Sequence, residues 1–481
     1  MLPTRRRGEP MTSAVVVGSG PNGLAAAVTL AAGGTKVTVL EASDVIGGGT
    51  RSGEATLPGL QHDECSGFHP LAVDNAFARS VSLQDHGLRW AWPEVQYSHP
   101  FEDGRGAAVW RSVDRTAAEL GSDGPSYRRL FGGLHERFDA IATEFLQPMV
   151  HVPRHPLALA RFGAYAAMPA TWLSRRWQQD ETRALWAGAA AHAFRPLGTL
   201  LSSAIGLALG TAAHRFGWPV AVGGSASITT AMAAVLASHG GRIETGTAVR
   251  HLEELAGADI VMLDTSPSAA ARMLGGHQPP RVARAYQRFR HGPAAFQVAF
   301  AVEGGIPWAH QPSRRAGTVH VGGSIEQIAA AERDVWRGRM PSRPFVLVGQ
   351  QSLADPARAH RDTHPIDAYA HVPAGWRGDA TQLIVAQIER YAPGFTGRIR
   401  GSRVRAVSDI EATNSNLVGG DILNGANTPR QLVFRPRAAL NQYATGVPGV
   451  YLCSAATPPG AGAHGMCGWH AARLALQSLD R

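Results

Sequence analysis

The chain has 481 residues, of which 44% are hydrophobic and 17% are charged. This length exceeds a single hydrophobic core, so two intertwined domains are expected and wholesale disorder is excluded. The net charge is +9, but Lys36 is the only lysine and the sequence has no RNA-binding motif or long basic run, so a nucleic-acid partner is not expected. The three cysteines lack disulfide-framework and metal-ligand spacing, which predicts no metal site and a cytoplasmic location.

The first ten residues, Met1 to Pro10, are predicted to be a disordered extension, and Met11 is a candidate for the true start. Arg5 to Arg7 followed by an apolar stretch resembles a twin-arginine export signal. That apolar stretch is the beginning of a cofactor motif, which cleavage would destroy, so we do not interpret it as a signal.

The stretch from Ala14 to Arg51 carries the strongest motif. Val15 to Val17 predicts a buried parallel strand, followed by the glycine turn Gly18-Ser-Gly20-Pro-Asn-Gly23 and the helix Leu24 to Ala32. The first glycine permits a tight turn, the second lets backbone amides approach a pyrophosphate, and the third lets the helix lie close to the strand. A diphosphate is therefore expected at the N-terminus of this helix.

The second strand, Lys36 to Leu40, ends in Glu41, where a carboxylate can accept both hydroxyls of an adenosine ribose and disfavours a 2′-phosphate. Gly47-Gly-Gly-Thr-Arg51 follows. A glutamate that ends the second strand, then Gly-Gly and an arginine, resembles the FAD-binding start of the amine oxidase and phytoene desaturase superfamily. In that group the Gly-Gly-x-x-Arg stretch runs under the diphosphate toward the flavin. The resemblance implies FAD, with a bare NAD(H) site as the alternative.

The polar stretch from Gln61 to Leu71 is helix-poor. In the resembled family the equivalent stretch crosses back toward the flavin, so His69 or Cys65 is a candidate to face the cofactor. The alternative is that both are ordinary loop residues.

From Asp74 to Gly217 the pattern becomes helical, with apolar residues at helical spacing in Tyr127 to Phe145 and Thr182 to Ala193. Pro196 to Ala213 carries no charge over eighteen residues, but Gly, Ser and Thr dilute it. A buried helix that lines an apolar substrate cavity is expected there rather than a membrane span. Leu157 to Leu173 is a candidate for shallow insertion into one membrane leaflet.

Trp218 to Ser225, the helix Ile228 to His239 and Thr247-Ala-Val249 resemble the family's second FAD-domain segment, in which the backbone at Val249 pairs with the adenine edge. Asp259 to Leu263 predicts a further buried strand. No second strand, glycine turn and helix with a terminal acid follows, so no separate NADPH domain is expected. The electron acceptor is then O2 or a quinone.

Residues 281–431 alternate strand-like runs with helices, which predicts the sheet of a substrate-binding domain; the runs are Ala295 to Val302, Thr318 to Val321 and Phe345 to Val348. Asp355-Pro, His364-Pro and the loop Gly419 to Gly425 have the spacing seen in phytoene desaturase-like oxidoreductases of the pyridine nucleotide-disulphide domain 2 type. The segment from Gly449 to Ala472 resembles the closing motif of the desaturases, in which a glycine loop follows the ribityl chain and the next helix points at the flavin. A thiol at the start of that helix, Cys467, is a candidate for a lowered pKa, and a packed thiol is the alternative to a covalent flavin link.

The resemblance implies an α/β fold with an FAD-binding Rossmann-like domain of the glutathione reductase-2 type, formed by residues 11–75, 215–275 and 435–481. Residues 76–214 and 276–434 would form an interwoven α+β substrate domain with a helical cap. The implied cofactor-binding residues are Gly18, Gly20, Pro21, Asn22, Gly23, Glu41, Ala42, Gly48, Arg51, Val249, Ala455, Gly465, Met466 and Cys467.

The implied reaction is dehydrogenation of a hydrophobic polyene, isoprenoid or alkyl chain by hydride transfer to flavin N5, which needs an apolar cavity and one base. His464 and His192 are the catalytic candidates; His214 and His364 are weaker ones. Ser454 to Thr457 and Trp469 depart from the carotenoid enzymes. Lys36 lies far from the position of the lysine used by many amine oxidases, which disfavours that chemistry without excluding amine substrates. A redox-neutral polyene isomerase, an amine oxidase-type flavoenzyme and a non-catalytic flavin-binding protein are the alternatives.

Overall fold

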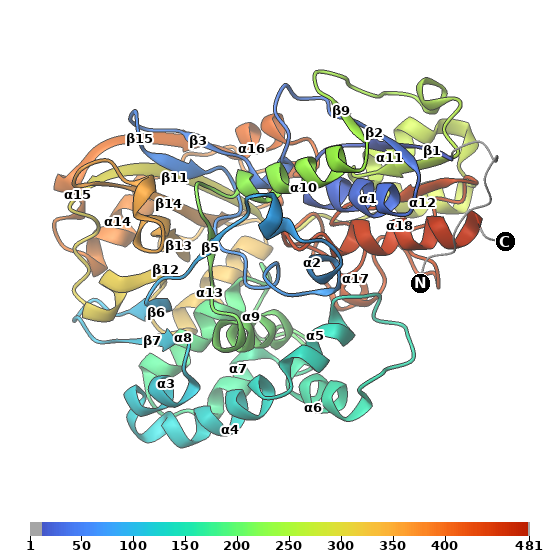
Figure 1. Ribbon diagram of the computed structural model, residues 1–481. Coiled ribbons are helices and arrows are strands. Elements are labelled where there is room, and N and C mark those ends of the chain that lie inside the picture. The colour runs from blue at the N-terminus through green and yellow to red at the C-terminus, as the bar shows by residue number, and fades with distance from the viewer. Residues whose placement is uncertain (1–11, 480–481) are drawn as a thin grey trace.

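The computed structural model describes residues 12–479, so the predicted extension Met1 to Pro10 lies outside the described residues. A five-stranded sheet carries the N-terminal motif (Figure 1). Its order is β16 (Val450–Leu452), β10 (Ile260–Leu263), β1 (Ser13–Val17), β2 (Lys36–Leu40) and β9 (Arg242–Glu244), and every pairing is parallel. Because the strands are parallel, their carboxyl ends meet at one edge, which is where open α/β sheets bind ligands.

Both faces of this sheet are buried. Ala14 and Val16 of β1 belong to the core under α1 (Pro21–Ala32), α10 (Ala226–Ser238) and α18 (Met466–Leu479), whereas Val17 packs with α11 (Pro267–Leu274) and α12 (Pro280–Gln287) on the other face. This alternation follows from the two-residue repeat of a strand. The helices α1 and α18 cross so closely that a Cβ at Gly468 would lie 1.8 Å from the carbonyl oxygen of Asn22.

A seven-stranded mixed sheet forms the second layer (Figure 1). Its order is β15 (Ile399–Arg405), β11 (Ala294–Glu303), β14 (Thr363–Val372), β13 (Val346–Gly349), β12 (Ala316–Val321), β6 (Val95–Pro100) and β7 (Gly106–Trp110). Alternate residues such as Phe296, Val298 and Phe300 build a core on one face, against α14 (Thr381–Tyr391). The other face turns toward the first sheet and the cap.

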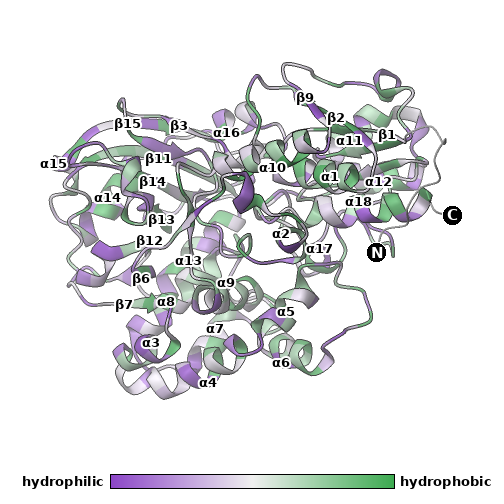
Figure 2. Ribbon diagram, viewed as in Figure 1, coloured by the Kyte–Doolittle hydropathy of each residue, from purple (hydrophilic) through white to green (hydrophobic). Residues whose placement is uncertain are grey.

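The helical cap lies below both sheets in Figure 1. It contains α3 (Val113–Glu119), α4 (Gly124–His135), α5 (Phe138–Phe145), α6 (Pro156–Ala166), α7 (Ala170–Leu173), α8 (Asp180–Ala191) and α9 (Ser203–Arg215). Figure 2 shows hydrophilic residues on the outer helices α3 and α4 and hydrophobic ones on α1. Among residues 12–479 no helix has the length and apolar character that crossing a membrane requires.

The helical segment Tyr127 to Phe145 forms two helices, α4 and α5. One helix prediction needs correction. The segment Pro196 to Ala213 becomes helical only at Ser203, because the preceding residues turn and Leu201 adopts a positive φ of 66°. The remaining elements are α2 (Ala76–Ser80), α13 (Ile325–Trp336), α15 (Phe395–Arg398), α16 (Val407–Thr413), α17 (Pro429–Val433) and the short strands β3 (Ser52–Glu54), β4 (Gln61–Asp63), β5 (Trp90–Ala91) and β8 (Val220–Ala221).

The strands of the first sheet come from residues 13–40, 242–263 and 450–452, and those of the second from 95–110 and 294–405. The chain therefore passes repeatedly between the two layers. The predicted α/β class, with a Rossmann-like sheet interwoven with a second sheet and a helical cap, is confirmed.

Candidate functional site

A cavity of about 1210 Å3 starts at the carboxyl edge of the five-stranded sheet and continues between both sheets and the cap. Its first part is lined by the glycine turn after β1, by Glu41 after β2 and by Val249. Its middle is lined by the loop from Ser454 to His464. Its far part lies against α6 and α9, so one space joins the predicted dinucleotide motif to the substrate side of the molecule.

The glycine turn leaves no room for side chains at its three glycines. A Cβ at Gly23 would lie 2.1 Å from the carbonyl oxygen of Gly18, and one at Gly20 would lie 2.7 Å from Oδ2 of Asp264. Gly18 itself has a φ of 101°. The turn therefore packs α1 directly onto β1 and closes around Asp264.

Asp264, at the end of β10, is a site residue that the sequence reasoning missed. Its Oδ2 accepts a hydrogen bond from the backbone N–H of Gly23 at 2.9 Å. Burial raises the pKa of this carboxyl to about 7, and the nearby charge of Glu41 adds to the increase. The available signal was its position, because β10 is the parallel neighbour of β1 and its carboxyl end must reach the same ligand edge.

Glu41 lines the cavity at the end of β2. Its Oε2 accepts hydrogen bonds from the backbone N–H and the hydroxyl of Ser19, at 2.8 and 2.6 Å, and its Oε1 accepts one from the N–H of Ser43 at 2.9 Å. The carboxylate is therefore held rigidly, and Oε1 retains one acceptor position for a hydroxyl group.

The Gly-Gly-x-x-Arg stretch lies on the glycine turn. The N–H of Gly47 donates to the carbonyl of Ser19 at 3.1 Å, and a Cβ at Gly48 would lie 3.1 Å from Cα of Gly20. The guanidinium of Arg51 donates to the carbonyls of Val45 and Thr413, at 2.8 and 2.9 Å. The stretch thus closes over the turn and brings Arg51 to the cavity wall.

Three buried polar atoms around this end of the cavity have no hydrogen-bond partner within residues 12–479. They are Asn22 Oδ1, Arg51 Nε and Thr265 Oγ1, and all three residues line the cavity. Buried polar groups are normally satisfied, so unsatisfied ones on a cavity wall favour a bound ligand. A dinucleotide fits, because it presents both phosphate acceptors and hydroxyl donors to this wall.

The closing loop approaches the cavity through Ala455 and His464. Nδ1 of His464 accepts a hydrogen bond from the N–H of Met466 at 3.1 Å, which caps α18, and burial lowers the pKa of the imidazole to about 4. Cys467 Sγ donates to the carbonyls of Thr457 and Gly460. The expected low pKa of this thiol is wrong: burial raises it to about 12, because desolvation outweighs the hydrogen bonds to Gly460 and Thr457 and the charge of Arg435.

The cavity brings together most of the residues that the sequence indicated. Those on its wall are Gly18, Gly20, Pro21, Asn22, Glu41, Ala42, Gly48, Arg51, Val249, Ala455, His192 and His464. Four others lie behind the wall: Gly23, Gly465, Met466 and Cys467. Gly465 allows a close approach there, since a Cβ would lie 2.8 Å from the ring of Phe77.

The far part of the cavity is an apolar chamber. Helix α9 lines it with Ile205, Ala208 and Leu209, as predicted for this uncharged stretch, and α6 contributes Phe162. Trp218 and the side chains before α6, Phe145 and Leu146, are also on its wall. Such a surface suits a hydrophobic ligand.

A polar cluster interrupts this apolar surface. Asp367 on β14 accepts hydrogen bonds from His62 Nδ1 at 2.7 Å, from the N–H of Asp63 at 3.1 Å and from Gln351 Nε2 at 2.8 Å. Asp367, His62 and Gln351 all line the cavity, and one-fifth of the Asp367 side chain is exposed to it. No sequence motif pointed to this group, because its members come from β4, β14 and the segment after β13 and meet only through side-chain hydrogen bonds.

Asp63, next to His62, is held in place by a buried arginine. The buried guanidinium of Arg358 donates to its Oδ2 at 2.6 Å and to Asp355 at 3.2 Å. A buried, fully paired network of this kind is costly to distort. It therefore holds the polar cluster in one geometry.

Three histidines and a cysteine that the sequence singled out are held by hydrogen bonds or have pKa values shifted by burial. His69 is buried and pairs with Ser225 Oγ at 2.8 Å, and burial lowers its pKa to about 4. Cys65 lines the cavity, but burial raises the pKa of its thiol to about 11. His214 pairs with Tyr127 away from the cavity. His192 Nε2 lies 2.9 Å from His320 Nε2, and burial lowers the pKa of His192 to about 3.

Arg435 is a further missed residue on the wall. It is buried beside Ala455, and its guanidinium donates to the carbonyl oxygens of Gln431 and Ala455 and to Asn427 Oδ1, at 3.0, 3.3 and 3.0 Å. Burial lowers its pKa. These acceptors are neutral, and the buried carboxylate of Asp421 acts on the guanidinium without forming an ion pair with it.

Comparisons with known proteins agree with this geometry. A family model described as NAD(P)-binding Rossmann-like domain matches residues 16–78. Pyridine nucleotide-disulfide oxidoreductase domain-containing protein 2 of Rattus norvegicus is 23% identical over 570 aligned positions, which cover 98% of this chain and 94% of that protein. Hydroxyneurosporene desaturase of Cereibacter sphaeroides is 29% identical over 163 positions, covering 33% of this chain and 32% of that protein.

Among solved structures, a putrescine oxidase bound to putrescine aligns with a TM-score of 0.61 and 17% identity, over 98% of this chain and 99% of that one. At this identity the likeness concerns the fold alone. The resemblance inferred from the sequence motifs is confirmed: the chain is similar to the pyridine nucleotide-disulfide oxidoreductase domain-containing protein over almost its whole length and to the desaturase over a third of it.

Proposed function

We propose that the protein is an FAD-dependent oxidoreductase that dehydrogenates a hydrophobic polyene, isoprenoid or alkyl-chain substrate. The observation that carries the proposal is the continuity of the cavity from the glycine turn to the apolar chamber. A dinucleotide held at the turn can extend its second half to the chamber, where a hydrophobic substrate would lie. A bare NAD(H) site would not need the Gly-Gly-x-x-Arg cover or the closing loop.

The FAD-binding residues are proposed to act in three groups. Glu41 would accept a ribose hydroxyl, and Val249 lies on the same part of the wall for the adenine. The glycine turn and Arg51 would hold the diphosphate, using the unpartnered Arg51 Nε. Ala455 and Arg435 would border the flavin, which supplies a two-electron acceptor when bound.

Arg435 is proposed to favour electron uptake at its part of the wall. Its charge is buried and rests on neutral acceptors, so it stabilises negative charge nearby more strongly than an exposed arginine would. A Cβ at Gly460 would lie 2.7 Å from its guanidinium, so the glycine loop is shaped to admit this side chain.

Dehydrogenation also needs a group that holds the proton leaving the substrate carbon. We assign this role to Asp367, because its carboxylate reaches the chamber wall and three donors fix its orientation. His192 and His464 also line the cavity, but burial lowers their pKa values to about 3 and 4, so neither imidazole is a stronger base than an ordinary carboxylate, and the orientation of Asp367 decides the assignment.

A second candidate function is amine oxidation. A carboxylate on an otherwise apolar wall also suits a substrate ammonium group, and the putrescine oxidase fold is similar. The redox-neutral isomerase remains the third candidate. Re-oxidation by O2 or a quinone is proposed for the oxidoreductase, and the free cysteines Cys65, Cys453 and Cys467 fit a reducing cytoplasm.

We further propose that the substrate enters from a membrane surface at α6 and α7. The exposed side chains Val152, Leu157, Trp172 and Leu200 lie on these helices or on the segments beside them. The Leu201 N–H donates to the carbonyl of Ala167, which ties the 198–202 segment to α6. Residues 147–176 contain four arginines and no acidic residue, so this face suits anionic lipid.

The first test is the absorption spectrum of the purified protein before and after acid precipitation, with mass identification of the released chromophore. Flavin bands and free FAD in the supernatant are expected. Anaerobic bleaching by a polyene or alkyl substrate would then support dehydrogenation, bleaching by amines alone would favour amine oxidation, and product formation without bleaching would favour the isomerase. A colourless protein that takes up no added FAD would overturn the proposal.

A further inference from the structure

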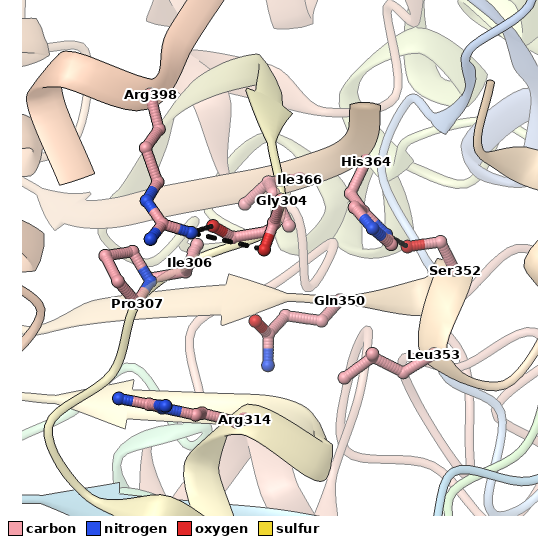
Figure 3. Close-up of a pocket in the computed structure, with 11 residues that line it drawn as sticks. Gly304, Ile306, Pro307, Arg314, Gln350, Ser352, Leu353, His364, Ile366 and Arg398 are labelled. Atoms are coloured by element: carbon pink, nitrogen blue, oxygen red, sulfur yellow. Dashed lines mark hydrogen bonds between the residues drawn. The ribbon is translucent and has the colours of Figure 1, made fainter. Parts of the chain in front are cut away.

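Figure 3 shows a second pocket, lined by residues of the seven-stranded sheet and its loops. It lies on the opposite face of this sheet from the large cavity. Ile366 of β14 lines this pocket, whereas the next residue, Asp367, lines the large cavity. Likewise, Gln350 lines this pocket and Gln351 lines the large cavity. The pocket has a volume of about 210 Å3.

The polar side of the pocket is cationic. Arg314 and Arg398 lie on its wall with His364, and none of the residues that line it is acidic. Arg314 Nε donates to the carbonyl of Trp308 at 2.7 Å, and one terminal nitrogen of Arg398 donates to the carbonyls of Gly304 and Gly305, both at 3.3 Å. Neither arginine forms an ion pair within residues 12–479, so most guanidinium N–H groups remain available.

Of the other polar groups, Gln350 supports the pocket and His364 can contact a ligand. The amide of Gln350 is fully used, because it accepts from Trp308 Nε1 at 3.0 Å and donates to the carbonyls of Ser313 and Ala316. It fixes the floor of the pocket. His364 Nδ1 lies 3.2 Å from Ser352 Oγ, which leaves its Nε2 for a ligand.

The remaining wall is apolar, formed by Ile306, Pro307, Leu353 and Ile366. In Figure 3 the two guanidinium groups lie on one side of the pocket, and Leu353, Ser352 and His364 on the other. The pocket therefore offers a site for an anion at one end and for a short carbon chain and hydroxyl groups at the other.

We propose that this pocket binds a small organic phosphate, with the phosphate between Arg314 and Arg398 and the carbon chain against Leu353 and Ile366. Guanidinium groups match phosphate oxygens with paired hydrogen bonds. A dianionic phosphate compensates both arginines, whereas a carboxylate compensates one. The volume admits a phosphate with a chain of a few carbons. This site is independent of the proposed FAD function.

The test is isothermal titration calorimetry on the purified, cofactor-saturated protein at constant ionic strength, with glycerol 3-phosphate and inorganic phosphate as probes. We expect glycerol 3-phosphate to bind, and Arg314→Gln and Arg398→Gln each to weaken it by at least about tenfold. Both side chains are at the surface of the pocket, and thermal denaturation verifies that the variants remain folded.

Two matched controls locate the binding. Arg400→Gln removes an exposed arginine that pairs with Glu303, two residues from Arg398, and Arg51→Gln removes the arginine of the large cavity. Unchanged binding in both supports the proposal. Loss with Arg51→Gln but not with Arg398→Gln, equal loss with Arg400→Gln, or no binding of either probe overturns it. If inorganic phosphate binds with the same affinity as glycerol 3-phosphate, the proposal that the ligand carries a carbon chain is overturned.

Discussion

Asp264 Oδ2 accepts the backbone N–H of Gly23 at 2.9 Å, so a buried carboxyl group occupies the N-terminal end of α1. This end of the helix is also where the diphosphate of a dinucleotide is expected, so two acidic groups would share one set of donors. The raised pKa of Asp264, about 7, means that its charge changes within the physiological range.

The first prediction concerns stability. The folded carboxyl has a pKa of about 7 against an ordinary value of 3.8, so the folded state holds its proton more tightly and stability is lost as pH rises between these values. A shift of this size corresponds to about 4 kcal/mol. Asp264→Asn keeps an oxygen for Gly23 but does not titrate. Its Tm should exceed that of the wild type by several degrees at pH 8, and the two should converge near pH 4.

The same pair predicts pH-dependent FAD binding. Above pH 7 the ionised Asp264 repels the diphosphate, so the FAD affinity of the wild type should fall as pH rises from 6 to 8. The affinity of Asp264→Asn should stay constant over this range, as measured by fluorescence titration of the apoprotein. An identical pH dependence in both proteins would rule out Asp264 as its origin.

A further prediction tests the packing of the glycine turn. Gly23→Ala would place Cβ 2.1 Å from the carbonyl oxygen of Gly18, so α1 must move away from β1. We expect a loss of FAD binding and a lower Tm, from a strain of about 2 kcal/mol or more. Gly276→Ala is the control, because a Cβ there has no atom within 4 Å. Equal behaviour of the two variants would contradict the packing argument.

These residues also indicate what the sequence could predict. The strand, glycine turn and helix were predictable because their spacing is local, and Glu41 follows from the end of the next strand. The contact of Asp264 with Gly23 was not predictable, because 241 residues separate the two in the sequence. Asp367 bonds His62, 305 residues earlier in the chain, through a side-chain contact between two separate sheets that no local pattern encodes. The pKa of the Cys467 thiol was not predictable, because the sequence shows its position at the start of a helix but not how deeply it is buried.

The buried charge of Arg435 should tune the cofactor. Arg435→Gln removes the positive charge beside Ala455 but retains a donor for its carbonyl. Loss of a charge-assisted interaction of about 1.5–3 kcal/mol corresponds to about 30–60 mV for a two-electron couple. The reduction potential of bound FAD should fall by this amount in spectroelectrochemical titration. Arg437→Gln makes the same charge change away from the cavity wall and should leave the potential unchanged.

Asp367 should control the chemical step. With Asp367→Asn we expect unchanged FAD content and a 10²–10⁴-fold slower anaerobic flavin reduction by substrate, because the proton acceptor is lost. In Glu54→Gln, which alters another carboxylate on the cavity wall, the substrate should reduce the flavin at the normal rate. If the substrate is an amine that Asp367 only binds, the variant will instead show a raised KM with little change in kcat, which would remove Asp367 from the proton-transfer role.

The exposed apolar face of the cap gives the last prediction. Leu157 and Trp172 are 80% and 60% exposed, whereas Leu159 and Phe162 of α6 line the chamber. A bilayer that covers the outer side chains would deliver a lipophilic substrate directly to the inner ones. The wild type should float with vesicles that contain anionic lipid, and less with neutral vesicles, because the arginines of this face add about 1 kcal/mol each.

The double variant Leu157→Asp with Trp172→Ser should lose at least tenfold in vesicle binding, since it removes apolar area and adds a negative charge. It should still oxidise a substrate dissolved in detergent at the normal rate, because neither side chain lines the cavity. Val404→Asp on β15, an exposed apolar residue of the other layer, is the matched control and should bind vesicles normally. If both variants float equally well, the cap is not the membrane face and the substrate must reach the chamber from solution.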